Sequence, residues 1–274
     1  MKAQIEKIQL SYIKSLKNYE IKYKSDHWQR GYERKKELLK FKNIKNFRNN
    51  SLSDGLDTRP GSANNQKKLY NQLKEEIGEK YLKKNLSSLN IGNLKNVLKI
   101  QGKLLDPNAL FHIRQLYDIE SQVKEKKIKP KIICEIGPGY GALSRLLIDK
   151  YNNAKYIIYD LPEANYLSSY YLLKNNPKKK FLFYCDVKNK NLSLKNIKNF
   201  DIIIIPPWIN LKDIKVDIFL NIRSFMEMDK SVIKKYFNLI HKTININGIF
   251  VNINRYEKRT VGYPIRIAEY PYDN

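Results

Sequence analysis

The feature that most constrains this chain is a glycine-rich stretch at residues 131–148. An apolar run over residues 132–136 is followed by Gly137, Gly139 and Gly141, and then by leucines at helical spacing. This order predicts a buried strand, a tight turn and a helix. Glycine permits positive φ and close approach of a ligand, and the free N–H groups at the start of the helix point into the same space. The stretch therefore predicts a nucleotide-like ligand at the carboxyl ends of parallel strands.

Two acidic residues near the turn favour one class of ligand. Gly137, Gly139 and Ala142 also match the looser dinucleotide pattern, which is a weak signal on its own. Asp160 ends the next predicted strand, where it would meet the ribose of either NAD or S-adenosylmethionine. Glu135 suits a free ammonium group better than a pyrophosphate, which binds to uncompensated N–H groups. The stretch favours a methyl donor over a dinucleotide, and a glycine turn without any ligand is the remaining alternative.

From residue 131 onward, apolar runs alternate with amphipathic segments, which is typical of a parallel α/β sheet. Further strands are expected at residues 155–160, 181–186, 200–208, 216–221 and 248–253. The first half is expected to be helical, with helices near residues 1–24, 66–82 and 107–123. Asp106 is expected to cap the last of these helices, because its carboxylate can accept hydrogen bonds from free N–H groups.

We therefore predict an α/β fold with a doubly wound, mostly parallel sheet and a helical N-terminal region. Residues 1–128 would form a helical cap or dimerisation region, and residues 129–274 a Rossmann-like catalytic domain that binds S-adenosylmethionine.

The net charge of +25 has two interpretations. A basic chain can bind nucleic acid or another polyanion. Alternatively, the excess is compositional, because Lys is abundant together with Asn, Ile and Tyr. The lysines are spread along the whole chain instead of forming a block, so the compositional interpretation is favoured. We therefore expect no specific nucleic-acid partner.

Several other classes of protein are disfavoured. Cys134 and Cys185 lie in apolar runs and cannot form a disulfide framework. No Cys–His cluster has metal-ligand spacing, so no divalent metal is predicted. The N-terminus does not have the pattern of a signal peptide, and no apolar stretch approaches the length of a membrane span. The expectation is a soluble, cytoplasmic protein.

Four segments in fixed order resemble the bacterial sugar O-methyltransferases, a branch of the S-adenosylmethionine-dependent class I methyltransferases. The segments are residues 135–141, 160–163, 221–228 and 254–258. The resemblance extends from near Phe47 to the end of the chain, and the ordered set is more specific than the glycine turn alone.

The resemblance implies a class I methyltransferase-like fold and a donor site for S-adenosylmethionine, with S-adenosylhomocysteine as the product. Glu135 and the glycines Gly137, Gly139 and Gly141 would hold the methionine part of the donor. Asp160 would hold its ribose, and Leu161 would lie beside the adenine.

A further acid, Asp186, ends the predicted strand over residues 181–186. It could accept a hydrogen bond from the adenine amine of the donor. A turn-forming Asp after a strand explains it equally well.

A sugar hydroxyl has a high pKa, so its methylation benefits from a general base. Relatives often carry a histidine where this chain has Met226. With no histidine at that position, Glu227 is the predicted catalytic residue. It follows a strand that should end near the donor. The alternative for Glu227 is a structural role in capping or pairing within the next helix. Arg255 and Tyr256 are predicted to contact the acceptor, where an arginine would suit a phosphate group.

The tripeptide Pro206-Pro207-Trp208 is similar to the D/N-P-P-Y/F/W motif of amino-methyltransferases. Ile205 stands at the position of the Asp or Asn that would grip an amine, which favours an oxygen target. Trp208 is predicted to contact the substrate, and its alternative role is to cover the edge of the core.

The predicted function is methylation of a sugar hydroxyl in surface polysaccharide or glycoconjugate biosynthesis. The expected partner is a sugar or glycoconjugate acceptor, and the N-terminal helices could form a homo-oligomer. One alternative is an amino-methyltransferase acting on nucleic acid or protein. Another is a non-catalytic binding protein that keeps the nucleotide fold.

Overall fold

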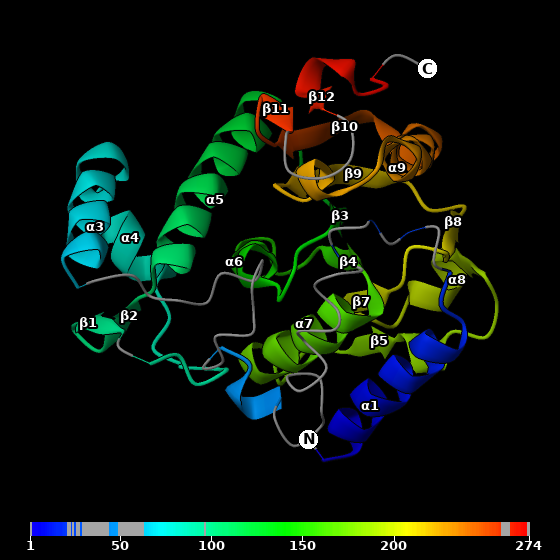
Figure 1. Ribbon diagram of the computed structural model, residues 1–274, viewed down its shortest axis with the longest axis horizontal. Coiled ribbons are helices and arrows are strands. Elements are labelled where there is room, and N and C mark those ends of the chain that lie inside the picture. Colours follow the sequence, from blue (N-terminus) through cyan, green and yellow to red (C-terminus); the bar gives the residue numbers. More distant parts are fainter. Residues whose placement is uncertain are drawn as a thin grey trace.

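The computed structural model describes residues 2–20, 23, 25, 28, 44–48, 63–95, 97–258 and 264–272. Its central sheet has six parallel strands in the spatial order β10-β9-β3-β4-β7-β5 (Figure 1). These strands are β3 (Ile132–Ile136), β4 (Lys155–Tyr159), β5 (Phe181–Phe183), β7 (Ile202–Ile205), β9 (Val216–Ile222) and β10 (Ile244–Ile253). The predicted parallel α/β fold is confirmed.

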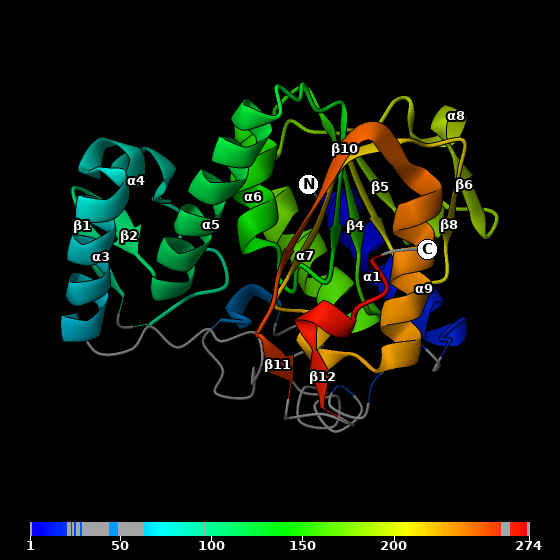
Figure 2. The same ribbon diagram turned by 90° about the horizontal axis from the view of Figure 1, so that it is seen from above.

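Helices cover both faces of the sheet (Figure 2). Runs of β-branched residues suit strands that are buried on both faces, and β7 consists of four buried isoleucines. One face packs against α6 (Ala142–Lys150) and α7 (Pro162–Asn175), and the opposite face packs against α9 (Lys230–Thr243). Because successive side chains of a strand point to opposite faces, the sheet separates two hydrophobic clusters.

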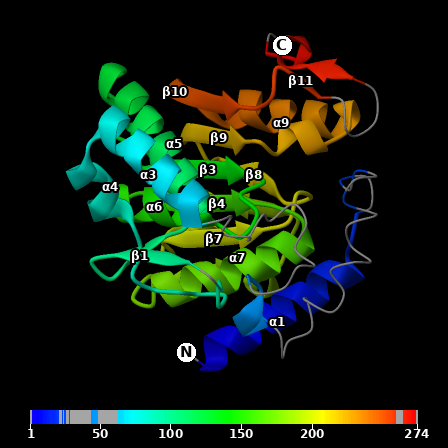
Figure 3. The same cartoon turned by 60° about the vertical axis from the view of Figure 1, so that its left-hand side comes forward.

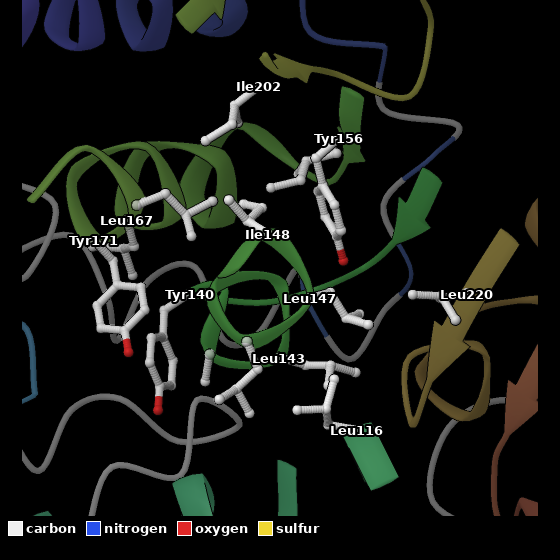
Figure 4. Close-up of a cluster of buried hydrophobic side chains, with 14 of the residues drawn as sticks. Leu116, Tyr140, Leu143, Leu147, Ile148, Tyr156, Leu167, Tyr171, Ile202 and Leu220 are labelled. Atoms are coloured by element: carbon white, nitrogen blue, oxygen red, sulfur yellow. The ribbon is translucent and has the colours of Figure 1, made fainter. Parts of the chain in front are cut away.

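The helix α5 (Pro107–Glu125) packs on α6, and its buried side chains share a hydrophobic cluster with those of β9. Figure 4 shows side chains of α6 in one cluster with Leu116 of α5, Tyr171 of α7 and Tyr156 of β4. The first turn of α5 has the expected cap, because the carboxylate of Asp106 accepts a hydrogen bond from the N–H of Asn108 at 3.1 Å.

The other N-terminal elements lie in two places. The helix α1 (Lys2–Lys17) packs along α7, where the rings of Tyr12 and Tyr166 stack with centroids 4.8 Å apart (Figure 3). The short helix η2 (Ile44–Asn46) precedes Phe47. The helices α3 (Ala63–Ile77) and α4 (Glu79–Asn85) lie outside α5, together with the hairpin β1 (Leu98–Ile100) and β2 (Lys103–Leu105). One hydrophobic cluster joins these elements to the sheet, and the boundary at residue 128 stays a prediction.

Some predicted boundaries were wrong. The helix expected over residues 66–82 is divided at Gly78, whose φ of +86° ends α3 and begins α4. The strand expected over residues 181–186 stops at Phe183, and Tyr184–Asp186 forms the 3-10 helix η3. Leaving the sheet there, the chain adds β6 (Asn191–Ser193), α8 (Leu194–Ile197) and β8 (Asn210–Lys212), with β6 and β8 paired.

The described end of the chain forms a small sheet outside the main one. Among the described residues, β12 (Ile265–Arg266) pairs antiparallel with β11 (Glu257–Lys258), and the two form a separate small sheet before the 3-10 helix η5 (Ile267–Glu269). No helix in the described part of the chain has the length and apolar character needed to cross a membrane.

Candidate functional site

A cavity of about 250 Å³ lies at the carboxyl ends of β3, β4 and β9. The strand order explains its position, because β4 and β9 flank β3 on opposite sides. The chain leaves β3 toward α6 on one face and leaves β9 toward α9 on the other. Open α/β sheets bind ligands in the crevice at such a switch point. The cavity is therefore the candidate active site.

The glycine turn forms the floor of this cavity. Gly137, Gly139 and Gly141 have φ values of +71°, +64° and +89°, which confirms the expected positive φ. The N–H of Gly137 donates to the carbonyl of Tyr159 at 2.8 Å. A Cβ on Gly137 would lie 1.9 Å from Oγ of Ser224. This position therefore requires glycine both for its backbone conformation and for its contact with the segment after β9. Gly137 and Gly139 line the cavity, whereas Gly141 caps the start of α6.

Asp160 lies beside the turn and lines the cavity together with Leu161. Its Oδ2 accepts the N–H of Gly139 at 3.0 Å, and its Oδ1 accepts the N–H of Leu161 at 2.7 Å. Burial raises the pKa of Asp160 to about 7, against the effect of these two hydrogen bonds, and the charges of Glu163 and Glu227 raise it further. Each carboxylate oxygen has a second lone pair, so Asp160 can still accept a hydrogen bond from a ligand hydroxyl.

A buried amide network holds the segment that follows β9. Asn221 is fully buried, and its Nδ2 donates to the carbonyl of Ile136 at 2.9 Å. Its Oδ1 accepts the N–H of Phe225 and an N–H of the Asn254 side chain, each at 2.9 Å. Oδ1 of Asn254 accepts the N–H of Met226 at 3.1 Å. Two of the segments that carry the resemblance are thus joined next to the cavity.

Glu227 ends the short helix η4 (Phe225–Glu227) and is half-buried in the cavity wall. Oγ of Ser25 donates to its backbone carbonyl at 2.6 Å. The charge of Glu227 contributes to the raised pKa of Asp160, so the two carboxyl groups lie within electrostatic reach of each other. The structure brings Glu227, Asp160 and the glycine turn together, and the catalytic role of Glu227 stays a prediction.

Besides Gly141, two predicted donor residues lie outside the cavity lining. Glu135 is buried behind the turn, where its Oε2 accepts from Oγ of Ser144 at 2.5 Å and from the hydroxyl of Tyr156 at 2.6 Å. Burial raises the pKa of Glu135. Asp186 forms an ion pair of 2.7 Å with Lys7 of α1. The structure therefore gives both carboxylates protein partners, and their contacts with the donor stay predictions.

The three predicted acceptor residues also lie outside this lining. Trp208 is buried in the core, and its Nε1 donates to the hydroxyl of Tyr184 at 3.2 Å. This placement corresponds to the alternative role of covering the core edge. Arg255 and Tyr256 are exposed beyond β10. Their contact with an acceptor stays a prediction.

Sequence reasoning missed the wall of the cavity that α5 contributes. Asn108 and His112 line it from consecutive turns of this helix, and their i, i+4 spacing was the only signal available in the sequence. Nδ1 of His112 lies 2.7 Å from Oε1 of Gln115. Burial lowers the pKa of His112. Arg223, with a φ of +61°, also lines the cavity and is exposed.

In the described part of the chain, no three His, Cys, Asp or Glu side chains are close enough together to hold a metal ion.

Comparisons with known proteins give structural matches only. No protein-family model matches the chain, and no curated protein matches it. Coclaurine N-methyltransferase, solved with N-methylheliamine and SAH, aligns at 14% identity over 82% of this chain and 61% of that chain, with a TM-score of 0.33.

Two other matches are shorter. An O-methyltransferase family 2 protein from Planctomyces limnophilus, solved with apigenin, has 13% identity over 44% of this chain and 31% of that chain, with a TM-score of 0.30. Human N-acetylserotonin methyltransferase, solved with SAM, has 14% identity over 52% of this chain and 36% of that chain, with a TM-score of 0.28. Each match spans less than two thirds of the other protein, and each TM-score is low. The function is therefore inferred from the cavity itself.

Proposed function

We propose that this protein is an S-adenosylmethionine-dependent methyltransferase. The observation that carries the proposal is the meeting of the glycine turn and the carboxylate of Asp160 in one cavity at the sheet's switch point. Asp160 has free lone pairs for the ribose hydroxyls of the donor, and Leu161 offers an apolar surface beside it. The residues present therefore fit this donor.

The same cavity is poorly suited to a dinucleotide. A pyrophosphate binds to free N–H groups at a helix N-terminus, but the N–H of Gly139 already donates to Asp160. Asp160 and Glu227 also place two carboxyl groups in the lining. Their charge would repel a pyrophosphate and attract the ammonium group of a methionine moiety.

The residues of the chain would mainly orient the reactants. When bound, S-adenosylmethionine supplies an electrophilic methyl group on a sulfonium. The turn and Asp160 would fix the position of that group, and positioning alone can supply much of the rate. Glu227 is the carboxylate proposed to orient the acceptor hydroxyl or to take its proton.

A sugar hydroxyl is the acceptor we propose. Ile205 is fully buried in β7, and Trp208 is buried in the core. The segment around these residues therefore offers neither a polar side chain to accept a hydrogen bond from an amine nor an exposed aromatic ring to stack on a base. Arg223 at the cavity suits an acidic group such as the phosphate of a nucleotide-linked sugar. An amino-methyltransferase acting on nucleic acid is the second candidate, favoured only by the net charge of +25.

Calorimetric titration with S-adenosylhomocysteine and, separately, with NAD tests the donor. We expect S-adenosylhomocysteine to bind and NAD to bind far more weakly or not at all. Binding of NAD alone would reject the proposal.

The acceptor is tested with methyl-labelled S-adenosylmethionine and a panel of hexoses, methyl hexosides, UDP-hexoses and duplex DNA. We expect label in a sugar and only weak, salt-sensitive binding of DNA. Methylation of DNA alone would select the second candidate.

A further inference from the structure

The wall that α5 contributes to the cavity is held by a helix cap, an ion pair and helix packing. The carboxylate of Asp106 caps this helix and also forms a buried ion pair with Arg48, and α5 packs on α6. His112 lies in the second turn of α5 and lines the cavity. Catalytic groups on a packed helix are held more precisely than groups on a loop. His112 is thus a fixed ring at the site.

Gln115 selects the tautomer of this ring. Its Oε1 lies 2.7 Å from Nδ1 of His112, and an amide oxygen can only accept a hydrogen bond. Nδ1 must therefore carry the proton, which leaves the lone pair of the neutral imidazole on Nε2. Within the part of the chain that the structure describes, Gln115 is the only hydrogen-bond partner of His112. Nε2 is therefore the ring nitrogen available to a ligand in the cavity.

The groups around His112 keep it neutral near pH 7. Burial lowers the pKa of His112 most strongly, and the positive charges of Arg223 and Arg145 lower it further. Asp106 and the hydrogen bond to Gln115 act in the opposite direction. A neutral imidazole with a fixed tautomer has the protonation state that a general base requires.

We propose that His112 takes the proton of the acceptor hydroxyl, with Gln115 as its positioning residue. This inference rests on the proposed function and deepens it. The O–H bond of the acceptor breaks, and its proton forms a new N–H bond at Nε2. The oxygen's electron pair forms the bond to the methyl carbon, while the carbon–sulfur bond breaks and its electron pair stays on sulfur. In this scheme Glu227 orients the hydroxyl for the reaction. After methyl transfer, His112 releases the proton to solvent.

The first test compares His112→Gln with His241→Gln. His241 lies on α9 outside the cavity lining, so the second variant makes the same change away from the site. With the sugar probe that the acceptor panel identifies, we expect His112→Gln to lower methyl transfer roughly 10²-fold or more. Binding of S-adenosylhomocysteine should be retained. Wild-type turnover in folded His112→Gln would overturn the proposal.

The second test measures methyl transfer as a function of pH. It also asks whether Gln115→Glu, which keeps an acceptor at Nδ1 of His112, preserves the positioning role of Gln115. At saturating S-adenosylmethionine, where weaker donor binding by protonated Asp160 does not limit the rate, methyl transfer should fall only below pH 6.5, where His112 becomes protonated. Gln115→Glu places a carboxylate at Nδ1, which raises the pKa of His112 and should move this acid limb to higher pH. Gln115→Leu should lose activity that Gln115→Glu largely retains. Glu227→Gln should not change the pH below which methyl transfer falls. If Glu227→Gln shifts or removes this fall in rate, the proton is taken by Glu227 and not by His112.

The third test needs no acceptor. Nitrogen-15 NMR of the apo protein, assigned with His112→Gln, reads the tautomer and the pKa of His112. We expect a proton on Nδ1 and a pKa below 6.5, and Gln115→Leu should change the tautomer ratio. A proton on Nε2 of the neutral ring would overturn the proposal even if S-adenosylhomocysteine binds. Failure of S-adenosylhomocysteine to bind would instead reject the proposed function.

Discussion

Two walls of the same cavity are built in different ways. The strand-end wall consists of Gly137, Gly139, Asp160, Ser224 and Glu227, and its geometry depends on positive φ values and on backbone N–H groups bonded to a carboxylate. The helical wall consists of Asn108 and His112, which α5 holds in place by packing on α6. Under the proposed function, the strand-end wall would bind the donor, and His112 of the helical wall would act on the acceptor.

Burial shifts the pKa values of Asp160 and His112 in opposite directions. It raises the pKa of Asp160 to about 7 and lowers the pKa of His112. In each case loss of water disfavours the charged form. A ligand that donates a hydrogen bond to Asp160 would restore its charge, whereas His112 needs no ligand to be in its basic form.

The largest expected effect concerns the backbone of the strand-end wall. Gly137→Ala should lower the free energy of unfolding by about 2–5 kcal/mol, because it combines an unfavourable positive φ with overpacking against Ser224. Gly102→Ala is the matched control, since its φ is +76° and nothing lies within 4 Å of the added Cβ. It should cost about 1–2 kcal/mol. Equal losses in urea denaturation would show that contact with Ser224 does not constrain the turn.

Asp160 provides the sharpest test of donor recognition. Asp160→Ala should weaken binding of S-adenosylhomocysteine by about 1–3 kcal/mol, the cost of removing a charged hydrogen-bond partner. Asp186→Ala serves as the control, because that carboxylate pairs with Lys7 outside the cavity. Calorimetry should show a loss only for Asp160→Ala. A comparable loss for Asp186→Ala would support its predicted contact with the adenine.

Glu227 tests whether the strand-end wall also acts on the acceptor. Glu227→Gln keeps the size of the side chain but removes its charge. Loss of one charged hydrogen bond to the hydroxyl should lower methyl transfer roughly 10- to 100-fold, with donor binding nearly intact. Melting temperature and turnover should be measured on one preparation. A lower melting temperature with unchanged turnover per folded molecule would assign Glu227 a structural role in η4 or the next helix.

The smallest expected effect is on the pH dependence of donor binding. The ribose hydroxyls would donate to ionised Asp160, so affinity should be highest above pH 7 and fall by up to about tenfold per pH unit below it. Asp160→Asn should remove this dependence. The free energy of unfolding depends on pH in the opposite direction. Because the folded protein raises the pKa of Asp160 from 3.8 to about 7, this group contributes stability that is fully present below pH 3.8 and lost as the pH rises through about 7. An affinity for S-adenosylhomocysteine that is flat between pH 5.5 and 8.5 would contradict the role of Asp160.

The sequence by itself determined the features that depend on neighbouring residues. Alternating apolar runs and helical periods predicted the parallel sheet, and the glycines after β3 predicted the positive φ values of the turn. Asp160 was placed at the end of its strand, and Asp106 at the cap of α5. These features follow from backbone sterics and local hydrogen bonding, which act over a few residues.

Only the tertiary structure decided what each side chain contacts. Trp208 faces the core instead of the cavity, Asp186 pairs with Lys7, and Asn221 joins β3 to the segment after β9. His112 reaches the cavity only because α5 packs beside the glycine turn. Such contacts join residues that are far apart in the chain, and they depend on strand order and helix packing. A local sequence pattern fixes neither of these, because both are set by the burial of apolar surface over the whole fold.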